Sequence, residues 1–490
     1  MIQRAWLLLV GAVAGLALAF TIDGHNPKAT AQDAAALARQ AAGAQPERSV
    51  PANQAQLMMS YSPVAKRVSP AVVNIYTARV TQQRTNPFYD LFFGQGRMAR
   101  PRVEQSLGSG VIVDAAGLVV TNNHVIEGAT EILVALADRR QFAAKLLFAD
   151  PRTDLAVLQL DDKGAKLPVA RLGDSDRAEV GDVVLAIGNP FGVGQTVTHG
   201  IVSAVARTGM GISDYQFFIQ TDAPINPGNS GGALVAMDGS IIGINTAIFS
   251  RSGGSNGVGF AIPANMVRIF LNAARTGKLV TAWVGVEGEP VTADTATSVG
   301  LDRPIGVLVT DVSAGSPAAR AGLRPGDVIY AIDGKEVADP GMLRYRMATQ
   351  PVGETVTVTL IRDRAARNLP LRLAAPPETP ARSLTAIGGT NLLTGVTVGN
   401  LSPAFAQELG AGLPERGVVV VRVDPRAPAA RLAFLQPGDV IDAINGQRVG
   451  TVGDVQRLAA SSAGMVVRLN RGGRVAECTF RPPSQFFCRS

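Results

Sequence analysis

A serine enclosed by glycines lies near the middle of the chain, in the stretch Gly228-Asn229-Ser230-Gly231-Gly232. A serine hydroxyl is a weak nucleophile, so it needs a nearby base and hydrogen-bond donors aimed at the oxygen that becomes negative. Glycines allow the backbone conformations that turn successive N–H groups toward one point. The stretch therefore fits a catalytic turn, and it also fits an ordinary surface turn between two strands.

The positions of the three histidines limit the kinds of catalytic site that remain. The pattern Gly-x-Ser-x-Gly also occurs in α/β-hydrolases, where the histidine follows the serine. His25, His124 and His199 all precede Ser230, which excludes that class. His25 lies in an Ala- and Gln-rich N-terminal segment, and His199 alternates with β-branched residues, as is typical of a structural strand position. His124 is the remaining candidate for the base.

Asp154 is the candidate carboxylate for this histidine. It stands at the start of the strongly apolar run Leu155–Leu158, thirty residues after His124. An acid at the mouth of a buried strand can accept the imidazole N–H and fix its tautomer. The order His–Asp–Ser is one of the orders in which this triad occurs.

Three blocks of this sequence resemble the triad blocks of the HtrA/Deg serine proteases: Thr121–Val125, Thr153–Leu158 and Gly228–Leu234. The resemblance runs from about Ser62 to the C-terminus. It implies a mainly β fold, with a chymotrypsin-like double six-stranded β-barrel followed by two PDZ (α+β) domains.

The same resemblance implies a role for each catalytic residue. Ser230 corresponds to the nucleophile, His124 to the general base and acid, and Asp154 to the carboxylate that orients the imidazole. The backbone N–H groups of Gly228 and Ser230 correspond to the oxyanion hole. The resemblance implies no cofactor, and the scattered histidines and two cysteines show no metal-ligand spacing.

Residues around the nucleophile are candidates for substrate specificity and for regulation. We expect an apolar pocket for a small aliphatic side chain, with barrel core as the alternative. Its candidate residues are Ile225, Asn226, Ile244, Asn245, Thr246 and Ala247. Arg207 matches the family's activation-sensing loop arginine, and a solvated loop cation is the alternative. Tyr61 is a candidate contact in a homotrimer, or in a multiple of trimers, as the resemblance implies.

Composition limits the class of protein and its partners. The 490 residues suffice for about three domains, and 53 glycines with only 5% aromatic residues favour β-rich globular domains. The formal net charge of +7 is spread along the chain without a dense Lys/Arg block. We therefore expect no nucleic-acid partner.

The N-terminus is typical of an export signal. Arg4 precedes the apolar run Ala5–Leu18, and Ala17-Leu18-Ala19 fits a cleavage site, which gives a signal over residues 1–19. An uncleaved anchor is the alternative, since the uncharged stretch extends to Ile22. Both place the domains outside the cytoplasm, in the periplasm. In an oxidising compartment Cys478 and Cys488 could pair, and the sequence leaves that open.

A long internal repeat organises the C-terminal half. The block Ser316–Gly334 recurs about 110 residues later as Ala427–Gly446, and a repeat of this length is a whole domain. Both blocks resemble PDZ domains. The predicted order is a flexible leader (20–59), the protease domain (60–277) with an inserted loop (82–104), PDZ domain 1 (281–375), a linker (376–388), PDZ domain 2 (389–482) and a tail (483–490).

PDZ domains bind an extended C-terminal peptide as an added strand, and backbone N–H groups hold its carboxylate. By resemblance, the carboxylate-binding loop of the first domain is Trp283, Val284, Gly285 and Val286, and that of the second is Leu393, Thr394, Gly395 and Val396. A purely structural PDZ domain without a ligand stays possible for each.

The sequence thus predicts an exported, ATP-independent serine endopeptidase that acts on unfolded protein substrates and degrades misfolded or damaged envelope proteins. Binding of C-terminal peptides to the PDZ domains would regulate it. Two alternatives are a holdase chaperone or PDZ scaffold with little proteolysis, and a membrane-tethered regulatory protease.

Overall fold

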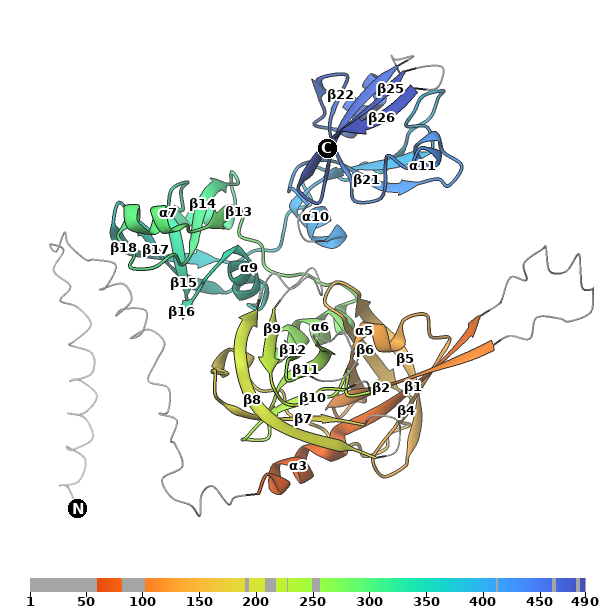
Figure 1. Cartoon of the computed structure of the whole chain (residues 1–490), viewed down its shortest axis with the longest axis vertical. Coiled ribbons are helices and arrows are strands. Elements are labelled where there is room, and N and C mark those ends of the chain that lie inside the picture. Colours follow the sequence, from red (N-terminus) through yellow and green to blue (C-terminus); the bar gives the residue numbers. More distant parts are fainter. Residues whose placement is uncertain are drawn as a thin grey trace, which may run out of the picture.

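Two barrels and two smaller α+β domains follow one another along the chain in the computed structural model (Figure 1). The predicted signal, leader and tip of the inserted loop lie outside the described residues. The structure describes residues 60–81, 102–189, 194–207, 217–226, 228–248, 256–410, 413–460, 464–481 and 485–489.

The first barrel is closed and antiparallel, with the strand order β1-β2-β3-β6-β5-β4. Helix α3 (Ser62–Val68) and a 3-10 turn, η1 (Ser69–Ala71), lead into it. Its strands are β1 (Val72–Thr81), β2 (Arg102–Asp114), β3 (Leu118–Thr121), β4 (Glu131–Ala135), β5 (Gln141–Asp150) and β6 (Leu155–Leu160). Strands β1 and β2 stay paired as far as Thr81 and Arg102, so the insertion leaves the barrel on a two-stranded ribbon (Figure 1).

The second barrel repeats this architecture with the order β10-β11-β12-β9-β8-β7. A 3-10 turn, η2 (Ser175–Arg177), precedes it. Its strands are β7 (Val183–Gly188), β8 (Thr196–Arg207), β9 (Phe218–Thr221), β10 (Ala233–Ala236), β11 (Ile241–Ile248) and β12 (Gly259–Pro263). Both barrels match the predicted double six-stranded architecture, and the predicted fold class is confirmed.

Helix α6 (Ala264–Thr276) closes the protease domain and covers part of both barrels. Its buried face includes Met266, Val267 and Phe270, spaced as an amphipathic helix requires. Phe270 makes an edge contact with Phe148 of β5, with ring centroids 5.7 Å apart. Gly277 ends the helix in the left-handed conformation (φ 74°), as its glycine predicts.

The first PDZ domain contains a sheet with the order β13-β14-β15-β17-β18, and β16 pairs with β15. Strand β13 is therefore at the edge of the sheet. The elements are β13 (Val286–Pro290), α7 (Ala293–Val299), β14 (Val307–Val312), α8 (Pro317–Ala321), β15 (Val328–Ile332), β16 (Lys335–Glu336), α9 (Pro340–Ala348), β17 (Thr355–Arg362) and β18 (Ala365–Arg372).

The second PDZ domain repeats this plan with an additional strand at each end of the sheet. Its elements are β19 (Thr385–Ala386), β20 (Val396–Leu401), α10 (Pro403–Leu409), β21 (Gly417–Val423), α11 (Pro428–Arg431), β22 (Val440–Ile444), β23 (Gln447–Arg448), α12 (Val452–Ala459), β24 (Met465–Arg471), β25 (Arg474–Arg481) and β26 (Gln485–Arg489). Strand β19 lies in the stretch predicted as linker, and β26 lies in the stretch predicted as tail.

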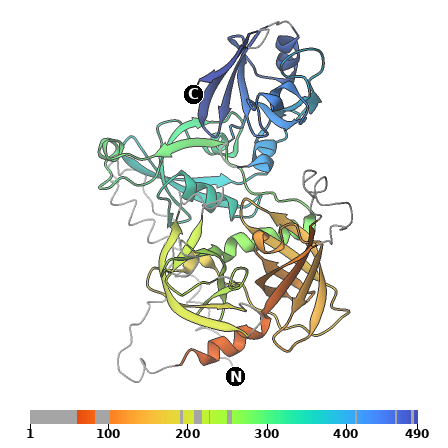
Figure 2. The ribbon, with the colours of Figure 1, turned by 45° about the vertical axis from the view of Figure 1, so that its right-hand side comes forward.

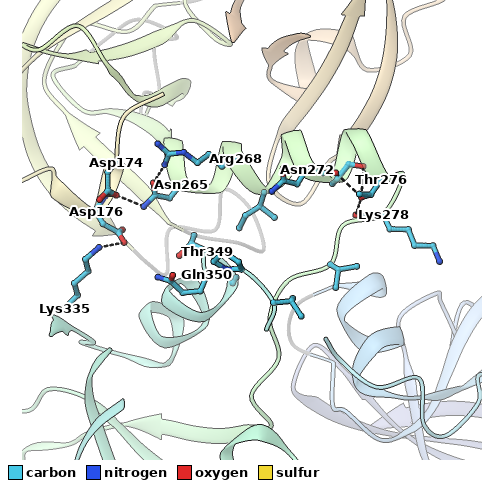
Figure 3. A pocket seen from close by; sticks show the side chains of 16 residues that line it. Asp174, Asp176, Asn265, Arg268, Asn272, Thr276, Lys278, Lys335, Thr349 and Gln350 are labelled. Atoms are coloured by element: carbon cyan, nitrogen blue, oxygen red, sulfur yellow. Dashed lines mark hydrogen bonds and ion pairs between the residues drawn. The ribbon is translucent and has the colours of Figure 1, made fainter. Parts of the chain in front are cut away.

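The first PDZ domain packs on the protease domain through a buried carboxylate. Asp176 of η2 has a side chain only 5% exposed and forms an ion pair with Lys335 at 2.9 Å (Figure 3). It forms a second ion pair with Arg346, also at 2.9 Å. Beside it, Tyr345 of α9 stacks on Phe217 with ring centroids 4.6 Å apart. Burial, with Asp176 nearby, raises the pKa of Tyr345, so its hydroxyl stays protonated. A cavity of about 780 Å³ lies nearby, between α6 and the first PDZ domain (Figure 3).

A disulfide joins Cys478 of β25 to Cys488 of β26, opposite each other in the sheet register. The sequence left this pairing open. Cys478 is buried in the core of the second PDZ domain, whereas Cys488 is exposed. The bond therefore fastens the last strand of the described chain to a buried strand.

We expect Cys488→Ala to destabilise the second PDZ domain by about 2–3 kcal/mol, the usual effect of losing a disulfide that closes a short loop. The variant keeps the buried Cys478 side chain, so the core packing is retained. Amide hydrogen exchange should accelerate in β25 and β26 and change little in the barrels. Wild type treated with a thiol reductant is the matched control, and unchanged exchange in both would contradict this role.

Candidate active site

The side chains of His124 and Asp154 are hydrogen-bonded at the end of the first barrel. The Nδ1 atom of His124 lies 2.9 Å from Oδ1 and 2.8 Å from Oδ2 of Asp154. The backbone N–H of His124 also donates to Oδ1, at 3.0 Å. A carboxylate on Nδ1 keeps the proton there and leaves Nε2 as the basic atom, as a general base needs.

The backbone of Asp154 is held in an uncommon conformation that aims its side chain at His124. Its φ is +56°, in the left-handed region that aspartate tolerates better than most residues. Its carbonyl accepts the side-chain amide of Asn122 at 3.0 Å and the backbone N–H of Asn123 at 3.1 Å. The polar break before His124, where α5 (Asn123–Ile126) begins, thus fixes the carboxylate that faces it.

Thr246 of β11 connects the carboxylate to the nucleophile. Its hydroxyl donates to Oδ2 of Asp154 at 2.5 Å, and its carbonyl accepts the hydroxyl of Ser230 at 3.2 Å. Ser230 Oγ therefore donates to the Thr246 carbonyl and not to His124. Transfer of the proton to His124 requires rotation of the Ser230 side chain about its Cα–Cβ bond, in keeping with the looser contacts of substrate-free sites.

The turn around Ser230 leaves two N–H groups free among the described residues, those of Gly228 and Ser230. The neighbouring N–H groups are engaged: Asn229 donates to Asn226 O at 2.9 Å, and Gly231 donates to Asn245 O at 2.8 Å. Gly228 has φ +98°, a conformation that favours glycine. Two free N–H groups on either side of one residue can bind the oxyanion of a tetrahedral intermediate.

Comparison with known proteins agrees with this geometry. The chain matches a trypsin-like peptidase domain over residues 108–244 and PDZ domains over 282–373 and 419–470. It is 37% identical over 455 residues to the periplasmic serine endoprotease DegP of Salmonella typhimurium, which covers 87% of this chain and 92% of the relative. The chain belongs to the DegP-like serine endoproteases.

A second curated relative supports the same family. A probable periplasmic DegP-like endoprotease of Chlamydia pneumoniae is 38% identical over 424 residues, which covers 82% of this chain and 85% of the relative. A solved HtrA-type protease, AlgW with a decapeptide, is 44% identical over 65% of this chain and 99% of its own, with a TM-score of 0.48. The trypsin-like peptidase domain and the DegP relative confirm the predicted serine endopeptidase activity.

In this DegP-like protease, Ile225 and Ile244, predicted to line the substrate pocket, lie in the core. They are 1% and 0% exposed. Ile225 belongs to a cluster of buried side chains in the second barrel, and Ile244 to a larger cluster that also includes residues of the first barrel. Asn245 is also buried, and its side chain donates to Ala233 O. Asn226 is exposed. The two isoleucines thus lie in the barrel core, which was the alternative to a pocket. The role of the predicted pocket residues in substrate specificity stays a prediction.

Two other predicted site residues have side chains outside the described part. Arg207 ends β8 and Ala247 lies in β11, and only their backbones are described. Their roles stay predictions. Within the described ranges, no group of acidic, His or Cys residues could hold a metal ion.

The carboxylate-binding loop predicted for the first PDZ domain has free donors. The carbonyls of Val284 and Gly285 accept N–H groups of Ala318 and Ser313, at 3.0 and 2.9 Å. The N–H groups of Val284 and Gly285 have no partner among the described residues. Trp283 and Val286 flank this loop, and Val286 begins the edge strand β13.

The corresponding loop of the second domain is already occupied by its own chain. Strand β19 pairs antiparallel with β20, along the edge that stays open in the first domain. At its end, the N–H of Gly395 donates to Ile387 O at 2.9 Å, and Ile387 N–H donates to Val396 O at 2.8 Å. Ile387 is buried in the core that includes Leu393, while Thr394 donates to Gly389 O. The predicted peptide site therefore holds residues 385–387 of the same chain.

Sequence reasoning placed the triad but missed several residues that hold it. Thr246 was predicted only to line a pocket, and the structure also shows its hydroxyl bound to Asp154. Asn122 and Asn123 lie in the histidine block Thr121–Val125, and the sequence predicted no role for them. Two successive buried amides before a candidate catalytic histidine are a signal that could have indicated one. Ser109 lies in β2 between two glycines, and nothing in that stretch of sequence indicated a role for it.

We expect Asp154→Asn to lower kcat by roughly 10⁴-fold, because an amide at this position favours the wrong imidazole tautomer. The fold should persist, since the substitution keeps the size of the side chain. Steady-state hydrolysis of a chromogenic peptide, with circular dichroism as the check on folding, measures this. Near-normal turnover of the folded variant would remove Asp154 from the triad.

Proposed function

We propose that this chain is an exported, ATP-independent endopeptidase that degrades misfolded or damaged proteins in the periplasm. The observation that carries the proposal is the combination, in one chain, of an Asp154–His124–Ser230 site with two domains of the kind that bind chain termini. The relatives are named as periplasmic enzymes. Among the described residues, no helix is long and apolar enough to span a membrane.

The first PDZ domain is the proposed receptor for C-terminal peptides. Its edge strand β13 is free on one side, and the N–H groups of Val284 and Gly285 are available for a carboxylate. A cavity of about 210 Å³ adjoins this loop, and Leu343 and Met347 of α9 form part of its apolar wall. These features suit an extended peptide with a hydrophobic terminal side chain.

The second PDZ domain acts as a cap on this receptor. Glu415 accepts the indole N–H of Trp283 at 2.5 Å and the Ser313 hydroxyl at 3.1 Å. Gln407 and Pro403 also line the cavity beside the loop. A peptide that reaches the end of the groove has to compete with these contacts, and the Glu415 carboxylate is the group most like its own terminus.

Helix α9 gives a route from the peptide groove to the nucleophile. Its Leu343 and Met347 line the cavity, while Tyr345 stacks on Phe217 of the protease domain. Phe217 directly precedes β9, the strand that leads into the turn carrying Ser230. A change in α9 on peptide binding would therefore be transmitted to the strand before the nucleophile.

Assembly into trimers is part of the proposal. Tyr61 at the start of α3 is 39% exposed, and its ring lies 5.5 Å from that of His199. An exposed aromatic side chain on a supported helix end suits a contact between protomers. Light scattering of the purified chain measures the oligomer, and Tyr61→Ala should shift it toward the monomer if this contact is correct.

Cleavage of reduced casein tests the main proposal against a chaperone or scaffold function. Wild type should degrade it and Ser230→Ala should not, and a hydrophobic C-terminal peptide should accelerate the wild type. No cleavage by folded wild type under any condition would favour the chaperone alternative. The mass of the mature N-terminus separates the remaining alternative, because a start at Phe20 indicates release and retention of residues 1–19 indicates an anchor.

We expect Glu415→Gln to tighten binding of a hydrophobic C-terminal peptide by about 3- to 10-fold, since the cap loses its charged hydrogen bonds to Trp283 and Ser313. Fluorescence anisotropy with a labelled peptide measures the Kd. Glu408→Gln is a matched control, because Glu408 is an exposed acid of the same domain that pairs with Arg382. Equal effects of both substitutions, or none, would refute the cap.

A further inference from the structure

Ser109 is a buried serine of the first barrel that contacts the nucleophile turn of the second. It lies in β2, within the stretch Gly108-Ser109-Gly110, and is 0% exposed. It is not a member of the triad, and its side chain is separated from Gly228 by 119 positions along the chain. Three of its groups nevertheless form hydrogen bonds with the turn or its immediate surroundings.

Two of these bonds hold carbonyls on either side of the oxyanion hole. The hydroxyl of Ser109 donates to Gly228 O at 2.6 Å, and its backbone N–H donates to Ser230 O at 2.8 Å. The same hydroxyl accepts the N–H of Asn189 at 2.8 Å. Because an N–H can only donate, the hydroxyl proton is committed to Gly228 O, and its orientation is unambiguous.

These contacts complete the fixing of the peptide units around Ser230. The peptide from Gly228 to Asn229 is held by Ser109 at its carbonyl and by Asn226 at its N–H. The peptide from Ser230 to Gly231 is held by Ser109 at its carbonyl and by Asn245 at its N–H. The N–H groups left free are those of Gly228 and Ser230, the two that face a developing oxyanion.

The packing at this point leaves little room for adjustment. A Cβ atom on Gly231 would lie 2.0 Å from the carbonyl oxygen of Ser109 and 2.5 Å from Oγ1 of Thr121. A Cβ atom on Gly188, which precedes Asn189, would lie 2.4 Å from Oδ1 of Asn229. The turn therefore packs closely against β2 and the end of β7. Ser109 of β2 is hydrogen-bonded to the turn and to Asn189, which follows β7.

We propose that Ser109 is a positioning residue for the oxyanion hole, which it sets from the opposite barrel. It touches neither substrate nor the reacting atoms. It acts by holding the carbonyls of Gly228 and Ser230, so that the peptide unit between them, which carries the N–H of Ser230, keeps its aim at the oxyanion. A preorganised donor stabilises the transition state more than the ground state, so the effect belongs in kcat.

The experiment compares Ser109→Ala in the full mature chain with wild type on a chromogenic peptide that has valine at P1. Losing one oxyanion donor outright costs about 10²–10³-fold, and loosening one should cost less. We expect kcat to fall about 10- to 100-fold with KM within about twofold. Ser109→Cys keeps the volume but is a weak donor, and it should show most of the same loss.

Inhibitor binding separates positioning from a merely structural role. A peptide boronate forms a tetrahedral adduct on Ser230 that uses the oxyanion hole, whereas the product peptide binds in the ground state. In Ser109→Ala the Ki of the boronate should rise by the same factor as kcat/KM falls. The Ki of the product peptide should stay near the wild-type value.

Thr121→Val is the matched control. Thr121 is equally buried, and its hydroxyl donates to the carbonyl of Ser109 at 2.7 Å, not to the nucleophile turn. It should lower Tm as Ser109→Ala does but keep kcat within about threefold. The proposal is overturned if Ser109→Ala and Ser109→Cys keep kcat within threefold, if the boronate Ki does not move, or if Thr121→Val loses kcat to the same extent.

Discussion

Catalysis in this chain depends on the register between two barrels that are each closed on themselves. His124 and Asp154 come from the first barrel, while Ser230 and Thr246 come from the second. Within the described part of the chain the two barrels share no strand, so the register depends on side-chain packing and a few hydrogen bonds. The bonds that cross at the site are those of Ser109 to the nucleophile turn and of Thr246 to Asp154.

This arrangement explains why the residues around the triad take part in so many hydrogen bonds. The Asp154 carboxylate accepts from the backbone and ring of His124 and from Thr246, and its own carbonyl is bound by Asn122 and Asn123. The bond from Thr246 crosses between the barrels, so a shift of one barrel against the other would break it. The other bonds hold Asp154 and His124 in place within the first barrel. The N–H groups of Gly228 and Ser230, the two donors that an oxyanion hole would use, have no partner among the described residues.

Features that lie within a short block could be predicted from the sequence, whereas contacts between distant segments could not. The triad was found because each member lies in a short block, and the barrel and PDZ classes followed from those blocks and the repeat. Ile225 was predicted to line a pocket because it lies on a loop, but a loop position does not show where a side chain points. Its side chain is buried, and its part in specificity stays a prediction. Ile387 lies in a proline-rich stretch that is typical of a linker, and its pairing with β20 depends on a register that the stretch itself does not specify.

Contacts between domains could not be predicted from the sequence either, and one of them joins the second PDZ domain to the loop of Asp154. Arg152, two residues before Asp154, donates to the carbonyls of Gln407 and Glu408 near the end of α10. The domain that covers the first peptide groove is thus also bound to the loop of the triad carboxylate. Under the proposed function, a peptide that displaces this domain also removes those bonds to Arg152. By thermodynamic reciprocity, any state of the active-site loop that weakens the Arg152 contacts must then favour peptide binding by the same free energy.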